Sequence, residues 1–145
     1  MINFETPHVH PIDLTPNGNT LVAVNTAAHK LEVWRVDGSS IATIGSIPVG
    51  LDPVSVRARS NTEVWVVNQI SDSVSIVDLQ QMTVIRTLAT DNEPADVVFS
   101  GNGRAFVSAS EANTINVFNL SNLEAAPARV SIDGEDPRAV AVAAG

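Results

Sequence analysis

Acidic and imidazole side chains recur beside four prolines, and they are the first groups in this sequence that could do chemistry. The residues directly before these prolines are His10, Asp52, Glu93 and Asp136. Asp13 and Asp96 each stand two positions after a proline. If the fold gathers these groups, they focus negative potential and attract a cation or a basic ligand. The alternative is that each acid only holds a turn by accepting nearby backbone N–H groups.

A second set of polar residues ends the apolar runs that follow the prolines. It comprises Asn25, Asn68 and Ser110, with His29, Asp72 and Glu111 in the segments just beyond. We expect Asn25, Asn68 and Ser110 to share a loop face with the residues beside the prolines, where together they would contact a ligand.

A metal site has weaker support. His8 and His10 flank one residue, so in an extended chain both imidazoles lie on one side, a spacing that can bind zinc or copper. A surface histidine pair is the alternative. We predict no cofactor, although a divalent cation could bind the acids together with His8 or His10.

The sequence contains no motif for nucleophilic catalysis, and we predict no catalytic residue. The chain has no cysteine, and none of its serines lies in a Gly-x-Ser-x-Gly elbow. Gly101-Asn102-Gly103 is typical of a hairpin turn. Trp34 and Trp65 lie in apolar runs, which favours packing over a ligand platform.

The elements that must position these groups form a repeat. Pro11, Pro53, Pro94 and Pro137 are 42, 41 and 43 residues apart. A period of about 40–45 residues is typical of the four-stranded blades of a β-propeller. We therefore predict one all-β partial propeller domain, with repeat units at residues 11–52, 53–93 and 94–136 and overhanging strands in residues 1–10 and 137–145.

Each unit reads as four short strands in antiparallel order. The predicted innermost strands are residues 12–15, 54–57, 95–99 and 138–143; the second strands are residues 21–25, 64–68 and 105–110; the third are residues 31–36, 74–79 and 115–120; and the outermost are residues 41–49, 84–89 and 129–132, with residues 2–6 in the place of another. The second strands are almost wholly apolar, as expected if neighbouring blades cover both faces. The outermost strands alternate with polar residues, as a solvated edge does.

Four segments resemble the YVTN family of β-propeller repeats. They are Val22-Ala-Val-Asn25, Val64-Trp-Val-Val-Asn68, Ser73-Val-Ser-Ile-Val-Asp78 and Ile47-Pro48-Val49-Gly50. The chain departs from that family in having no tyrosine. The resemblance implies a propeller and a periplasmic or extracellular location, and it implies no shared catalytic residue.

The net charge and the apolar runs of the chain exclude some classes of binding partner. The 145 residues carry a formal charge of -8, which argues against nucleic acid and against anionic membrane surfaces. No apolar run is long enough to insert into a membrane, and the N-terminus shows no signal peptide.

Three blades do not close a ring, because propellers have roughly 4–8 blades. Two copies of the chain would give six blades, so we expect a homodimer that covers both open flanks. A fragment of a larger propeller, or another oligomer, is the alternative.

Two functions fit these observations. The first is a non-catalytic binding or structural module whose loop face around the channel presents a ligand or protein site. The second is a propeller enzyme, a lactone hydrolase or an oxidoreductase, that uses a metal or an acidic cluster at the channel mouth. Whether the ligand is a small molecule or a protein is left open.

Overall fold

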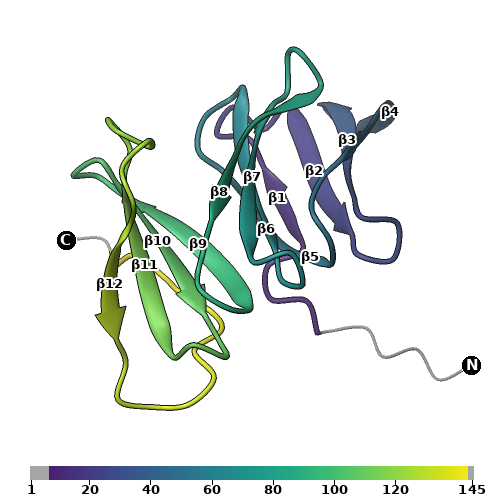
Figure 1. The fold of residues 1–145 in the computed structure, drawn as a ribbon. Helices are drawn as coiled ribbons and strands as arrows, with labels where there is room; N and C mark the ends of the chain where they lie inside the picture. Colours follow the sequence, from purple (N-terminus) through teal and green to yellow (C-terminus); the bar gives the residue numbers. More distant parts are fainter. Residues whose placement is uncertain (1–6, 144–145) are drawn as a thin grey trace, which may run out of the picture.

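Three four-stranded antiparallel sheets stand side by side in chain order (Figure 1). This computed structural model describes residues 7–143, so the strand predicted at residues 2–6 lies outside the described residues. Every described element is a strand, which confirms the prediction of an all-β partial propeller. No helix long and apolar enough to cross a membrane occurs among residues 7–143.

Each sheet is a simple meander. The first blade contains β1 (Ile12–Leu14), β2 (Thr20–Asn25), β3 (Lys30–Asp37) and β4 (Ser40–Pro48). The second contains β5 (Pro53–Ala58), β6 (Glu63–Asn68), β7 (Ser73–Asp78) and β8 (Thr83–Ala89). The third contains β9 (Pro94–Ser100), β10 (Arg104–Ala109), β11 (Thr114–Asn119) and β12 (Ala128–Ser131). The first strand of each blade is innermost and the fourth is an outer edge.

The hydrophobic core lies between blades. One cluster joins the first and second blades and includes Val33, Ile47 and Val66, all nearly or fully buried. A second joins the second and third blades around Trp65, whose ring forms T-shaped pairs with the rings of Phe99 and Phe118 at centroid distances of 5.2 and 6.4 Å. Each blade face therefore depends on its neighbour for burial, as in other repeat architectures.

The innermost strands lie beside one another and run in the same direction. The N–H of Val56 donates to the carbonyl of His10 at 2.9 Å, and the hydroxyl of Ser55 donates to the carbonyl of Ala95 at 2.7 Å. The segment before β1 thus abuts β5, and β5 abuts β9. This arrangement brings polar side chains from different blades to one inner wall.

Residues 138–143 do not form the strand that the sequence predicts. They do lie where the innermost strand of a next blade would lie, because the Ser108 hydroxyl donates to the Arg138 carbonyl at 2.6 Å and the Val140 N–H donates to Asp96 Oδ2 at 3.2 Å. A strand needs a ladder partner, and this segment pairs with no second strand among residues 7–143. Side chains hold it in place instead.

The first blade has one uncovered apolar flank. Leu14, Leu21 and Trp34 lie side by side in the sheet register, and Leu14 is 48% exposed. The corresponding row in the second blade includes Val64 and Val77, which are fully buried against the first blade. The same kind of surface is thus covered in one blade and open in the other.

Candidate functional site

A cavity of about 370 Å³ opens on the inner strands. Asp13 of β1 and Arg57 of β5 are its charged lining residues, and Val98 and Phe99 of β9 with residues 140–142 form most of its apolar wall. It lies where three successive blades and the C-terminal segment meet, so it is the place where inner-strand side chains could act on a ligand.

Sheet register explains why these side chains share a level. Asp13 pairs with Val22, Arg57 with Trp65 and Val98 with Phe106, which are matching positions in the three second strands. The β5 and β9 ladders also shift register near their start. Counting from the prolines therefore equates Asp13 with Asp96, whereas the structure places Asp13 at the level of Arg57.

Arg57 binds Asp96 with a two-pronged ion pair. Its Nε and NH2 groups donate to the two carboxylate oxygens at 3.3 and 2.9 Å. Asp96 is fully buried and also accepts the N–H groups of Val97 and Val140. Its four acceptor directions are thus occupied, and this carboxylate ties β5, β9 and the C-terminal segment together. Arg57 NH1 makes no hydrogen bond to residues 7–143.

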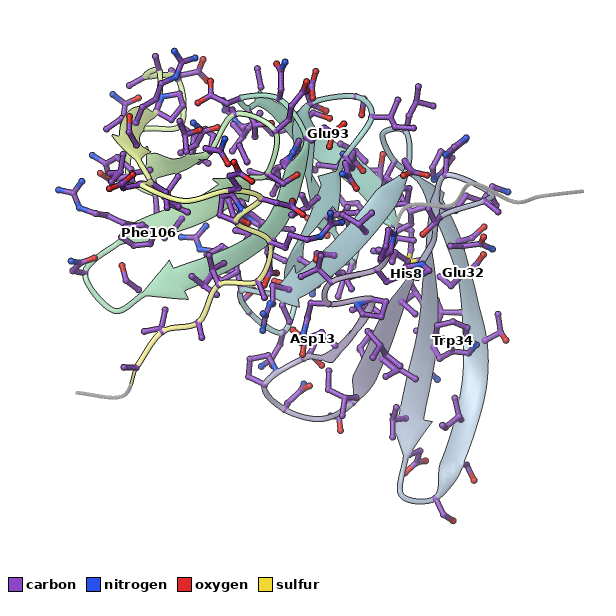
Figure 2. All side chains as sticks on the ribbon, turned by 90° about the horizontal axis from the view of Figure 1, so that it is seen from below. His8, Asp13, Glu32, Trp34, Glu93 and Phe106 are labelled. Atoms are coloured by element: carbon purple, nitrogen blue, oxygen red, sulfur yellow. The ribbon has the colours of Figure 1, made fainter. Side chains whose placement is uncertain are left out.

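Asp13 joins the first blade to the second (Figure 2). Its two carboxylate oxygens accept the N–H groups of Leu14 and Ala58 at 2.9 and 2.8 Å. Nε2 of His10 lies 4.0 Å from Asp13 Oδ1 and, although buried, has no hydrogen-bond partner in the described part of the chain. His10 therefore carries a free ring nitrogen beside a cavity-lining carboxylate.

The residues before three of the prolines form a repeated backbone clasp. Asp52, Glu93 and Asp136 have φ angles of 57°, 54° and 51°, in the left-handed region. Their N–H groups donate to His29 Nδ1, Asp72 Oδ1 and Asn113 Oδ1 at 3.1, 2.9 and 2.9 Å, respectively. In each blade the loop after the second strand thus holds the loop that leaves the fourth. These predicted loop-face residues have a structural role in the clasp.

Their carboxylates differ in surroundings. Glu93 accepts the side-chain N–H of Gln69 at 3.1 Å, and the Asp136 side chain is 61% exposed. Asp52 is largely buried, and its Oδ2 has no hydrogen-bond partner within the described ranges. The structure therefore places Asp52, Glu93 and Asp136 in successive loops without bringing them to the inner cavity.

The polar residues that end the second strands also hold the fold. Asn68 is fully buried and donates to the hydroxyls of Ser73 and Ser75 at 3.2 and 3.0 Å. Asn25 accepts the N–H of Ala28 and donates to Glu32, and Ser110 donates through both its N–H and its hydroxyl to the carbonyl of Glu93. None of these three lines the inner cavity.

His8 and His10 have separate surroundings. The Thr26 hydroxyl donates to the carbonyl of Pro53 at 2.7 Å, so His8 Nε2, 2.6 Å away, donates to the Thr26 oxygen. Across residues 7–143, no three histidine or acidic side chains come together as metal ligands.

Arg57 is the functional candidate that sequence reasoning missed. A signal was present, since it is the one basic residue in the first three inner strands. Only the register shift reveals that it stands level with Asp13.

Three adjacent four-stranded blades with charged side chains on their inner strands define a segment of a β-propeller. A family model described as "Lactonase, 7-bladed beta-propeller" matches residues 3–145. The chain belongs to this family. The finer resemblance to YVTN repeats stays a prediction.

Solved structures share the fold at low sequence identity. Hydrazine synthase from Kuenenia stuttgartiensis matches with a TM-score of 0.78 and 23% identity over 94% of this chain and 40% of its own. A putative 6-phosphogluconolactonase from Bacteroides uniformis matches with a TM-score of 0.73 and 18% identity over 88% of this chain and 45% of its own. A functionally unknown protein from Desulfotomaculum acetoxidans matches with a TM-score of 0.69 and 22% identity over 83% of this chain and 40% of its own.

These likenesses concern the fold alone. The chain spans less than half the length of each of these three structures. No curated protein matches it significantly.

Proposed function

We propose that the chain supplies part of the wall of a small-molecule channel in a lactonase-family propeller, and that the inner cavity binds a hydroxylated cyclic ester. The observation that carries this proposal is the cavity of about 370 Å³ with Asp13 and Arg57 on its wall. Binding pockets for small molecules are typically about 300–1,000 Å³ and combine apolar walls with a few polar groups.

The wall offers complementary contacts to a lactone of the sugar type. Arg57 NH1 is available to donate to a ring or carbonyl oxygen, and the exposed part of Asp13 can accept from a ligand hydroxyl. Val98, Phe99 and Val140 present apolar surface to the ring carbons. Binding without chemistry satisfies all of these contacts.

Hydrolysis of the bound ester is a second candidate, favoured by His10 and by the family. In this reaction the His10 ring, whose buried Nε2 does not line the cavity, turns toward it, and Nε2 takes a proton from water while the water oxygen attacks the lactone carbonyl carbon. The NH1 group of Arg57, which Asp96 does not bind, donates a hydrogen bond to the negative oxygen that forms, and Asp13 stabilises the imidazolium. The ring C–O bond then breaks, and the departing oxygen takes the proton from His10, which leaves an open-chain hydroxy acid.

Calorimetric titration with gluconolactam tests the binding proposal, because this cyclic amide resists the spontaneous opening of the lactone. Ala141→Phe fills the cavity from its exposed rim, and Ala125→Phe, in a groove on the outer strands, is the matched control. We expect saturable binding that Ala141→Phe weakens at least tenfold and Ala125→Phe leaves unchanged. Equal binding by both variants, or none by the unmodified chain, would refute the site.

Turnover is tested separately by following the opening of gluconolactone above its spontaneous rate. If His10 is the base, His10→Gln abolishes the excess rate while gluconolactam still binds. Binding with no excess rate in the unmodified chain rejects hydrolysis and retains the binding module.

A further inference from the structure

The charges around the inner cavity are unbalanced toward the negative. Asp13 and Asp96 each bring a negative charge, and Arg57 brings the one positive charge among the lining residues. The ion pair with Asp96 neutralises Arg57, so Asp13 remains as the uncompensated charge when His10, whose Nε2 lies 4.0 Å from Asp13 Oδ1, is neutral. No other lysine or arginine lines this cavity within residues 7–143.

From this balance we infer that the ligand of the cavity is uncharged, and that a phosphorylated sugar lactone is discriminated against. The inference rests on the proposed function and deepens it by naming the class of ligand. The name of the Bacteroides uniformis structure suggests a phosphorylated lactone as the ligand of that protein. The ligand inferred for this chain differs from it by having no phosphate.

Arg57 is badly placed to hold a phosphate. Arginine recognises phosphate best through two parallel N–H groups. Two of its three nitrogens already bind Asp96, at 3.3 and 2.9 Å, which leaves only NH1 for a ligand. Turning the fork toward a phosphate would leave the carboxylate of Asp96, which is fully buried, without its cation. Breaking a buried pair in this way is strongly unfavourable.

Asp13 adds direct repulsion. Its side chain is 29% exposed, so a ligand in the cavity meets a partly desolvated negative charge. For a doubly charged phosphate several ångströms away, Coulomb repulsion at a surface-like dielectric weakens binding by roughly tenfold or more. An uncharged ligand meets no such penalty, and its hydroxyls can donate to Asp13.

The test compares gluconolactam with its 6-phosphate by calorimetry on the unmodified chain. We expect the phosphate to bind at least roughly tenfold more weakly at low salt, and the gap to narrow as salt screens the repulsion. Asp13→Asn is expected to narrow the gap as well. Glu124→Gln removes one negative charge from the exposed outer groove and is the matched control, with the gap unchanged.

The outcomes separate the two proposals. Binding of the phosphate as tightly as gluconolactam, or more tightly, overturns the inference while the cavity keeps its proposed function. Binding of neither compound refutes the proposed function, and the inference falls with it. If Asp13→Asn disturbs folding, as circular dichroism would show, the salt dependence of the unmodified chain decides the matter.

Discussion

Replacing Gly50 by alanine should destabilise the protein strongly, although the change adds one methyl group. A Cβ at this position would lie 2.6 Å from Cγ and Nδ2 of Asn68 and would also overlap Oγ of Ser71. Real Cβ atoms do not approach other heavy atoms so closely. Asn68 cannot withdraw easily, because it is fully buried and hydrogen-bonded to Ser73 and Ser75.

The magnitude follows from two costs and one small gain. Overpacking a tight site costs about 1–3 kcal/mol. Displacing Asn68 weakens two buried hydrogen bonds, each worth about 1 kcal/mol. The reduced freedom of the unfolded chain returns about 0.4–1 kcal/mol. We therefore expect Gly50→Ala to lower the free energy of unfolding by about 2–4 kcal/mol.

Urea unfolding followed by tryptophan fluorescence measures this difference, with protein concentration held constant because association shifts apparent stability. Gly101→Ala is the matched control, since nothing lies within 4 Å of its added Cβ, and it should change stability by less than about 0.5 kcal/mol. A second substitution, Asn68→Ala, should restore part of the loss by making room. The steric reasoning is wrong if Gly50→Ala unfolds at the same urea concentration as Gly101→Ala.

The remaining predictions concern the clasp, the core and the open flank. His29→Leu removes the acceptor of the Asp52 N–H and should lower the free energy of unfolding in urea by about 1–2 kcal/mol. His29→Asn supplies the same kind of acceptor as Asn113 in the third blade and should lower it less. Equal losses of stability in the two variants would contradict the clasp. Trp65→Asp buries an unpaired charge and should cost several kcal/mol by thermal unfolding, so unchanged stability would contradict the inter-blade core. The isolated chain should have about twice its monomer mass by light scattering, and Leu14→Glu on the open flank should shift it toward monomer; a monomeric unmodified chain at all concentrations would reject self-association.

Self-association as a homodimer stays a proposal, and the C-terminal segment constrains its form. Residues 138–140 occupy the place beside β9 that the β1 strand of an incoming copy would need. A six-bladed ring therefore requires this segment to move, and it would depart from the seven blades of the family.

Compensating changes between blades illustrate what a repeat alignment misses. Gly50 and Asn68 in the second blade's inner corner correspond to Asp91 and Ala109 in the third. In the third blade the Asp91 carboxylate accepts from Thr114 and Asn116 at 2.9 and 2.8 Å. In the second blade the polar side chain at this corner comes from the strand, as Asn68. In the third blade it comes from the loop before the first strand, as Asp91. Each residue alone looks unremarkable in the sequence, because only the pair conserves volume and hydrogen bonding.

The roles of the charged candidates were equally hidden. The sequence predicts Asp52, Glu93 and Asp136 as ligand contacts from their repetition, and a ligand role of their side chains stays a prediction. The structure adds that their backbone N–H groups form the clasp. Repetition of a residue type is expected for either role, because a repeated turn needs its hydrogen-bond partners in every copy. The clasp is visible only in the tertiary structure, because it joins a loop side chain to a backbone N–H group about 20 residues away.

The amino-acid sequence by itself determined the blade and its four strands, because proline spacing, turn residues and apolar runs act over short stretches of chain. The tertiary structure alone decided which side chains meet at the inner wall. Asp13 and Arg57 share a cavity because the β5 ladder has a register shift at its start that the β1 ladder lacks, and the spacing of residues from the prolines does not reveal that shift.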